Sequence, residues 1–245
     1  MPAERTTRPA FYAMRPGRVR SWWTILHPPY TAWHLSYVAI GASLAPQIDG
    51  VRLTGTLFAF FCAVGVSAHA LDEVHGHPLN SGLSDIALWI VAVAGLLASV
   101  GLGALGLSRV GPGLLIFIVV GAVLLVAYNL ELFGGRLHSD VVFAASWGSF
   151  PVLTSYYAQA ERLDEVAVVA AIAAFLLSWA QRSLSSKARE LRRRVVRVEG
   201  TMTRADGSVA SLDTTSLLQP LEVALHALAW GMVVLAVAMT LFRFS

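Results

Sequence analysis

The chain has 245 residues, of which 56% are hydrophobic and only 13% are charged. With a mean hydropathy of +0.63, this composition is typical of a single-domain polytopic membrane protein. The single cysteine, Cys62, excludes a disulfide framework. The net charge is +3, and every basic residue except Lys187 is an arginine, a side chain that suits phosphate groups. No nucleic-acid-reading module accompanies these arginines, so we expect no nucleic-acid partner.

Residues 1–27 form a basic and aromatic segment that we predict to be cytoplasmic, and residues 28–245 form the transmembrane domain. No short apolar core with a small-residue cleavage site follows the basic start, so we expect no cleaved signal peptide. Seven apolar segments follow, each near the roughly 20 residues that cross a bilayer. They cover residues 30–46, 54–71, 86–107, 110–130, 141–159, 164–181 and 219–242. The sequence therefore predicts an all-α bundle of about seven transmembrane helices.

The basic residues divide unevenly between the two sides of such a bundle. Five lie in residues 1–27, one is Arg136 and eight lie in residues 182–204, which places fourteen on the side of the N-terminus. The other side carries Arg52, Arg109, Arg162 and Arg243. Because arginine-rich loops stay in the cytoplasm, we predict a multi-pass protein of the cell membrane with a cytoplasmic N-terminus. The C-terminus is then expected on the opposite side.

A cluster of ionisable residues ends the second apolar segment. It comprises His69, Asp72, Glu73, His75 and His77. Ionisable groups at a membrane edge are costly and point to function, and in a helix His69 shares one face with the two carboxylates. Carboxylates suit Mg²⁺, whereas imidazoles suit Zn²⁺ or Fe, so all five residues are candidate metal ligands. The alternative is a polar cap that ends the segment in water.

Two further polar segments lie on the predicted cytoplasmic side. Residues 128–140 contain Tyr128, Asn129 and Arg136, and they form an anion or metal site only if the loop folds against the first cluster. Otherwise they form an ordinary polar turn. Residues 182–218 are expected to begin with a basic helix over 182–194 and to continue as a β-hairpin. This long loop is either a lid that brings arginines to a phosphorylated substrate or a retention signal that rests on anionic lipid headgroups.

Three stretches make the chain resemble the UbiA superfamily of intramembrane prenyltransferases. They are His27–Pro29 with the small-residue run Tyr37–Ala45, the segment Ala68–His77, and the segment Tyr128–Gln159 with Phe143 and Trp147. Together they cover roughly residues 27–182. Asp72 matches the central aspartate of the first family motif, Asn-Asp-x-x-Asp-x-x-x-Asp, and Tyr128 matches the tyrosine after the fourth helix.

The chain departs from the family pattern at several positions. His69 and Gly76 replace two aspartates of the first motif, although Glu73 is an adjacent substitute. The second motif, Arg-Asp-x-x-x-Asp, is absent, because no carboxylate follows Arg182 until Glu190. The family also has nine helices, so the last two would be missing here. A second copy of the chain or another partner chain is then expected to cover the open wall.

The resemblance implies a divergent prenyltransferase that acts on a prenyl diphosphate at the cytoplasmic face of the membrane, with Mg²⁺ at the first acidic motif and basic residues in place of the second. Asp72, Glu73 and Tyr128 are then expected to be catalytic. Substrate contacts are expected from His34, Asn129, Arg136, Arg182, Lys187 and Arg189. Two alternatives stay open. One is a non-catalytic membrane subunit that binds a lipid or a partner, and the other is a metalloenzyme that holds Zn²⁺ or Fe.

Overall fold

The computed structural model describes residues 18–245, and the remaining part of the predicted basic segment lies outside it. The helices are α1 (Arg18–Ile25), α2 (Pro28–Leu44), α3 (Gly50–Phe60), η1 (Phe61–Ala68), α4 (His69–Val74), α5 (Asp85–Val110), α6 (Leu114–Asn129), α7 (Asp140–Ala144), η2 (Ala145–Ser149), α8 (Phe150–Ala160), α9 (Glu165–Arg193) and α10 (Thr214–Phe244). Two strands, β1 (Gly200–Thr203) and β2 (Val209–Leu212), pair between α9 and α10.

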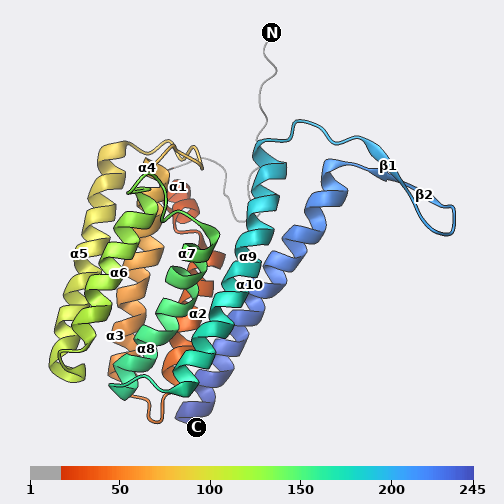
Figure 1. Cartoon of the computed structure of the whole chain (residues 1–245). Coiled ribbons are helices and arrows are strands. Elements are labelled where there is room, and N and C mark those ends of the chain that lie inside the picture. The colour runs from red at the N-terminus through yellow and green to blue at the C-terminus, as the bar shows by residue number, and fades with distance from the viewer. Residues whose placement is uncertain (1–17) are drawn as a thin grey trace.

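The described helices join into long rods that run between two ends of one bundle (Figure 1). Each of the seven predicted apolar segments coincides with such a rod, and two rods are continuous series, α3–η1–α4 and α7–η2–α8. Within the described residues, four rods are long and apolar enough to cross a membrane, namely Gly50–Val74, α5, α9 and α10, and α6 is a shorter apolar helix. The all-α membrane bundle is therefore confirmed, whereas the count of seven spans stays a prediction.

The two ends of the bundle differ in their loops (Figure 1). We call the end that carries residues 75–84, residues 130–139 and the hairpin the polar end. We call the end that carries the C-terminus the far end. Many large apolar side chains on α5, α6, α9 and α10 are exposed around the bundle between these ends. Monomeric soluble proteins rarely expose apolar surface on this scale, so the exposed faces fit a lipid environment.

Helix starts follow local sequence signals. A side-chain oxygen accepts a hydrogen bond from a backbone N–H of the first turn at Asp49, Ser84, Ser139, Asp164 and Asp213. Such N-caps satisfy backbone donors that have no partner within the helix. The proline pair that begins α2 fits the first helical turn, where a missing N–H costs nothing. These signals are local, which explains why the sequence located the helices well.

Close backbone approach holds the central rods together. A Cβ added at Gly41 of α2 would lie 2.5 Å from the carbonyl oxygen of Val152 in α8. A Cβ added at Gly148 of η2 would lie 2.6 Å from the carbonyl oxygen of Ala174 in α9. No other residue fits at these separations. Small residues at helix interfaces allow this approach in membranes, where van der Waals packing drives helix association.

The basic helix predicted over residues 182–194 is present, but it is not separate from the sixth apolar segment, because α9 continues without a break to Arg193. Its 29 residues span about 43 Å at 1.5 Å per residue, which exceeds the roughly 30 Å of bilayer hydrocarbon. The basic turns of α9 therefore extend beyond the apolar part of the bundle at the polar end. The predicted hairpin is confirmed, with Gly200 paired to Leu212, and it projects sideways from this end (Figure 1).

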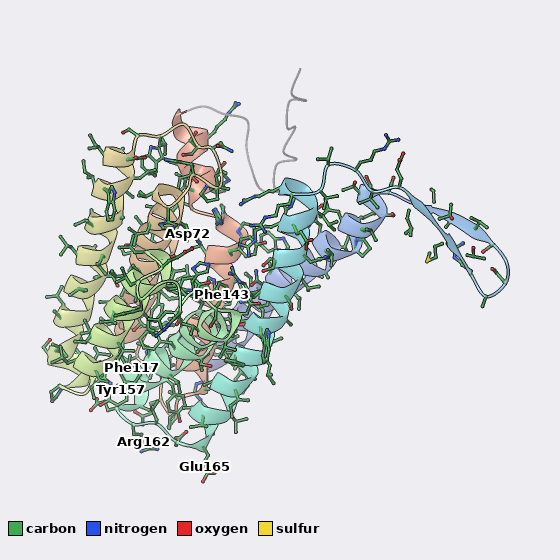
Figure 2. The ribbon with its side chains drawn as sticks, turned by 45° about the horizontal axis from the view of Figure 1, so that its top comes forward. Asp72, Phe117, Phe143, Tyr157, Arg162 and Glu165 are labelled. Atoms are coloured by element: carbon green, nitrogen blue, oxygen red, sulfur yellow. The ribbon has the colours of Figure 1, made fainter. Side chains whose placement is uncertain are left out.

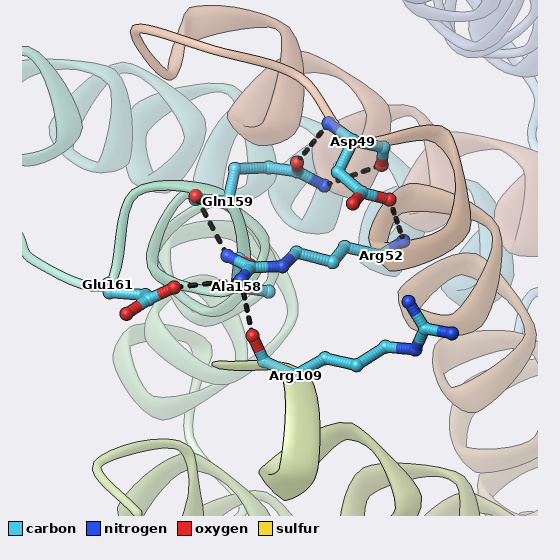
Figure 3. A network of polar contacts seen from close by, with 6 residues as sticks. All are labelled: Asp49, Arg52, Arg109, Ala158, Gln159 and Glu161. Carbon is cyan, nitrogen blue, oxygen red and sulfur yellow. Dashed lines mark hydrogen bonds and ion pairs between the residues drawn. The ribbon is translucent and has the colours of Figure 1, made fainter. Parts of the chain in front are cut away.

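A polar network closes the far end of the bundle (Figure 3). The Arg52 guanidinium donates hydrogen bonds to the carbonyl oxygens of Ala158 and Gln159, both at 3.2 Å, and to that of Arg109. It also forms a 2.8 Å ion pair with Glu161. These carbonyls lie at the C-terminal ends of α5 and α8, where backbone acceptors lack partners within the helix. Arg52 therefore joins the ends of three rods.

Candidate functional site at the polar end

A polar cavity of about 830 Å³ lies at the polar end of the bundle. The structure brings ten predicted site residues to its wall: His34, His69, Asp72, Glu73, His75, Tyr128, Asn129, Arg182, Lys187 and Arg189. Two others, His77 and Arg136, do not line it. The residues come from rods that are far apart in the sequence, from α2 to α9. The second polar segment therefore lies beside the first cluster through Tyr128 and Asn129, which is the condition that the sequence set for an anion or metal site, whereas Arg136 and His77 lie outside the cavity wall.

Two π-helical segments shape the cavity. The segment η1 ends directly before His69, and η2 contains Trp147. The backbone carbonyl of Trp147 lies 2.8 Å from Nδ1 of the buried His34 ring. A carbonyl oxygen only accepts hydrogen bonds, so Nδ1 of neutral His34 carries the proton and Nε2 keeps its lone pair. Short π-helical insertions frequently mark functional sites, and here one of them orients a cavity side chain.

Asp72 and Glu73 are adjacent in the sequence but have different environments. Both Glu73 oxygens accept backbone hydrogen bonds at 2.9 Å, one from Leu79 and one from Ser81. The Glu73 side chain is fully buried, and His77 Nδ1 lies 4.0 Å from it. A buried carboxylate is stable only with such partners, so Glu73 holds the loop between α4 and α5. It lines the cavity, but its oxygens are already engaged.

Asp72 is the carboxylate available to a ligand. It lines the cavity, and its carboxylate makes no hydrogen bond or ion pair with any residue in the described part of the chain. In Figure 2, Asp72 and Phe143 lie toward the polar end of the bundle, whereas Arg162 and Glu165 lie at the far end. Of the two carboxylates predicted to be catalytic, only that of Asp72 therefore has oxygens without a hydrogen-bond partner among the described residues.

The basic face of α9 forms one side of the cavity. Arg182 pairs with Asp140 at 3.0 Å and stacks over the Phe143 ring, with 4.9 Å from Cζ to the ring centroid. Lys187 pairs with Glu190 at 2.9 Å. Arg189, Arg193 and Arg194 also line the cavity, and none of these three has an ion pair with a carboxylate among residues 18–245. Three guanidinium groups of the cavity wall therefore lack an ion-pair partner among the described residues.

Aromatic rings form a further part of the cavity wall. Tyr128 stacks on His138 with 4.4 Å between centroids and meets the edge of Trp147 at 5.8 Å. Phe143 lies 6.1 Å from Tyr128. The aromatic faces carry negative electrostatic potential, which attracts cations. The site therefore combines a cationic wall for anions with an aromatic wall that suits a positive carbon centre.

Several buried polar atoms around the cavity have no hydrogen-bond partner in the described structure. They are His69 Nδ1, Tyr128 Oη and Gln181 Oε1. All three residues line the cavity, and each is at most 9% exposed. Buried polar groups are almost always satisfied by protein or by a bound molecule. Their concentration here indicates a cavity that is built to hold a polar ligand.

The sequence analysis did not assign several residues of the cavity wall to the site, among them Arg193, Arg194, His27 and Gln181. His27, assigned only to the helix entry, stacks on His69 at 4.5 Å. Burial lowers the pKa of His27 well below its ordinary value, and neighbouring His69 and Arg193 add to this effect. Gln181 is the last residue of the sixth predicted segment. Its position beside Arg182 on a basic helix is the one signal that could have identified it.

The candidate metal ligands do not converge. Within the part of the chain that the structure describes, no group of three or more His, Cys, Asp or Glu side chains could hold a metal ion. Glu73 is bonded to its loop, His77 Nε2 lies 3.2 Å from Asp85, and His75 Nε2 lies 3.8 Å from Glu131. These residues therefore do not fit a Mg²⁺, Zn²⁺ or Fe ion that the protein holds by itself, because their ligand atoms face different partners.

No protein-family model, no curated protein and no solved structure matches this chain. The resemblance to the UbiA superfamily therefore rests on the residues quoted for it and stays a prediction.

Proposed function

We propose that the polar cavity binds the phosphorylated head of an isoprenoid lipid at the cytoplasmic face of the cell membrane, and that the protein transfers the prenyl group from it. The observation that carries this proposal is that Arg189, Arg193 and Arg194 line one cavity together with Asp72, and that none of the four side chains has an ion pair within the described residues. The exposed apolar helices below the cavity support a lipid rather than a freely soluble anion.

In this proposal the arginines take the place of a metal cluster. Guanidinium groups form charge-assisted and often bidentate hydrogen bonds to phosphate oxygens. As the carbon–oxygen bond of the prenyl diphosphate breaks, diphosphate leaves with the electron pair, and fixed cations stabilise the charge that develops on it. The aromatic wall of Tyr128 and Trp147 then faces the allylic cation. An acceptor donates its electron pair to this carbon and loses a proton to the Asp72 carboxylate.

A binding subunit without transfer activity is the second candidate. The observation that favours it is the engagement of Glu73 by two backbone N–H groups, which leaves a single free carboxylate in the first acidic motif. Such a protein would bind the phosphorylated lipid through the same arginines but would release no diphosphate. Its function would then lie in an assembly with a second copy of the chain or with a partner chain. Such a chain would also cover the open bundle wall that the sequence predicts.

Binding and transfer are tested separately on the purified full chain. Heat-unfolding shifts are measured with geranyl, farnesyl and geranylgeranyl diphosphates, with and without Mg²⁺, and diphosphate release is measured in parallel. A ligand at 100 times its Kd raises the free energy of unfolding by about 2.7 kcal/mol. The double variant Arg189→Gln, Arg193→Gln is expected to abolish the shift. The control Arg204→Gln, in the exposed turn of the hairpin, is expected to keep it.

The outcomes separate the candidates. A shift that needs the two arginines, together with diphosphate release that needs Asp72, supports the transferase. The same shift without release supports the binding subunit. No shift with any of the three diphosphates, or a shift that the double variant leaves unchanged, would exclude this cavity as the site of a prenyl diphosphate.

A further inference from the structure

A second cavity, of about 230 Å³, lies between α3, α5, α6 and α8. Its inner end is bordered by Val64 and Trp147, and its outer end by Arg52 and Arg109 at the far end of the bundle. Along α5 it extends from Leu96 to Arg109, which corresponds to about 20 Å at 1.5 Å per residue. A cavity of this length and volume is narrow, so it has room for one extended chain and not for two.

The walls of this cavity are mostly apolar and include three phenylalanine rings, those of Phe60, Phe117 and Phe150. Gly55 of α3 also lines the wall, and a Cβ added there would meet no atom within 4 Å. A larger side chain at this position would therefore enter the cavity instead of clashing with a neighbouring helix. The lining predicts a hydrocarbon occupant, because the transfer of apolar surface out of water and its contact with other apolar groups are both favourable.

Two polar groups mark this cavity at different depths. The Ser146 hydroxyl lines its inner part, is 3% exposed as a residue, and has no hydrogen-bond partner in the described structure. At the outer end, the Arg109 guanidinium has neither a hydrogen bond nor an ion pair to a described residue. The nearby acids are engaged, since Asp49 caps α3 and Glu161 pairs with Arg52 (Figure 3). The N–H donors of the Arg109 guanidinium are therefore available to a ligand at the mouth.

We propose that this apolar cavity binds a single-chain lipid with an acidic head group, whose chain occupies the cavity and whose head pairs with Arg109 at the far end. The site is distinct from the polar cavity and takes its ligand from the opposite side of the bundle. The charge of Arg109 selects an acidic head, and the narrow cavity excludes lipids with two chains. The proposal does not depend on the function assigned to the polar cavity.

The two cavities share Val64 and Trp147 as lining residues. The competing occupant is therefore the tail of a lipid whose head lies in the polar cavity. The two occupants differ in orientation. The charged head of the proposed lipid lies at Arg109, whereas the charged head of the competing lipid lies at the basic turns of α9. A change at Arg109 affects only the first, whereas a change at Gly55 affects either one.

The test measures binding of radiolabelled oleate to the purified full chain, with oleyl alcohol as the uncharged ligand of equal tail. Gly55→Leu fills the cavity, and Gly101→Leu is its matched control, because Gly101 also has open space around its Cβ but does not line the cavity. Arg109→Gln removes the charge at the mouth, and Arg162→Gln is its control at the same end (Figure 2). Geranylgeranyl diphosphate binding is measured on the same variants.

We expect Gly55→Leu to weaken binding of oleate and of oleyl alcohol by at least about tenfold, and Arg109→Gln to weaken oleate alone by about tenfold, a loss typical of one charge-assisted contact. Both controls should bind as the unmodified protein does. Absence of saturable oleate binding, or binding that Gly55→Leu leaves intact, would overturn the proposal. Equal effects of Arg109→Gln on acid and alcohol would overturn the assigned head group. If only geranylgeranyl diphosphate responds to Gly55→Leu, the cavity holds the tail of that ligand, and the proposed function survives while this inference fails.

Discussion

Replacing Glu73 is expected to destabilise the protein far more than replacing the adjacent Asp72. The Glu73 carboxylate is fully buried and accepts hydrogen bonds at 2.9 Å from the backbone N–H groups of Leu79 and Ser81. A hydrogen bond to a charged group contributes about 1.5–3 kcal/mol. Loss of both in Glu73→Ala should therefore lower the free energy of unfolding by about 3–6 kcal/mol. For a chain of this size, each kcal/mol lowers Tm by about 2–4 °C.

Asp72→Ala provides the matched comparison, because the Asp72 carboxylate has no hydrogen bond or ion pair with a described residue. Its removal should leave Tm within a few degrees of the unmodified protein or raise it, as unpartnered charges in a site cost stability. Glu73→Gln should fall between, since an amide keeps one acceptor but turns an N–H toward a backbone N–H. Heat unfolding of the purified protein without ligand measures all three. Equal losses for Asp72→Ala and Glu73→Ala would refute the assignment of Asp72 to ligand binding and Glu73 to the loop.

Three other predictions concern single side chains. His34→Asn should retain more stability than His34→Ala, because an amide N–H still donates to the Trp147 carbonyl. Both variants should weaken ligand binding. Equal Tm values for the two variants would contradict the role of this hydrogen bond. Arg52→Ala should lower the free energy of unfolding by about 2 kcal/mol through its lost carbonyl contacts, and an unchanged Tm would show that the far-end network is dispensable. Backbone hydrogen bonds from Arg52 and Val51 lower the pKa of Asp49 below its ordinary value of 3.8. The Asp49 carboxylate, which caps α3, therefore stabilises the protein fully above pH 3.8, and this stabilisation is lost as the pH falls through the lowered pKa. The Tm difference between unmodified protein and Asp49→Ala should therefore shrink only below pH 3.8, and a difference lost by pH 5 would contradict this account.

The sequence by itself determined where the chain is helical. Apolar run length, N-cap residues and the Pro28–Pro29 entry act within a few positions of each other, so they are readable without a fold. The hairpin was also predictable, because the turn at residues 205–208 lies between short alternating strands. The basic helix after residue 181 was predicted as well, but not its fusion with the sixth segment, because helix-forming residues on both sides of a boundary do not show whether the two stretches join without a break. The hydrophobic composition also predicted a membrane protein, because composition does not depend on which residues are in contact in the fold.

Only the tertiary structure decided which of the predicted residues share a cavity. Asp72 and Glu73 are neighbours in the chain and both line the cavity, but consecutive residues of a helix point about 100° apart, so the Glu73 carboxylate reaches the backbone of the loop and the Asp72 carboxylate does not. His34 and Trp147 meet because α2 packs against the rod that contains η2, a contact between residues more than 100 positions apart in the chain. The apolar cavity that ends at Arg109 had no signal in the sequence. Cavities arise from how helices rotate and pack against each other, and residue spacing along one helix does not encode that arrangement.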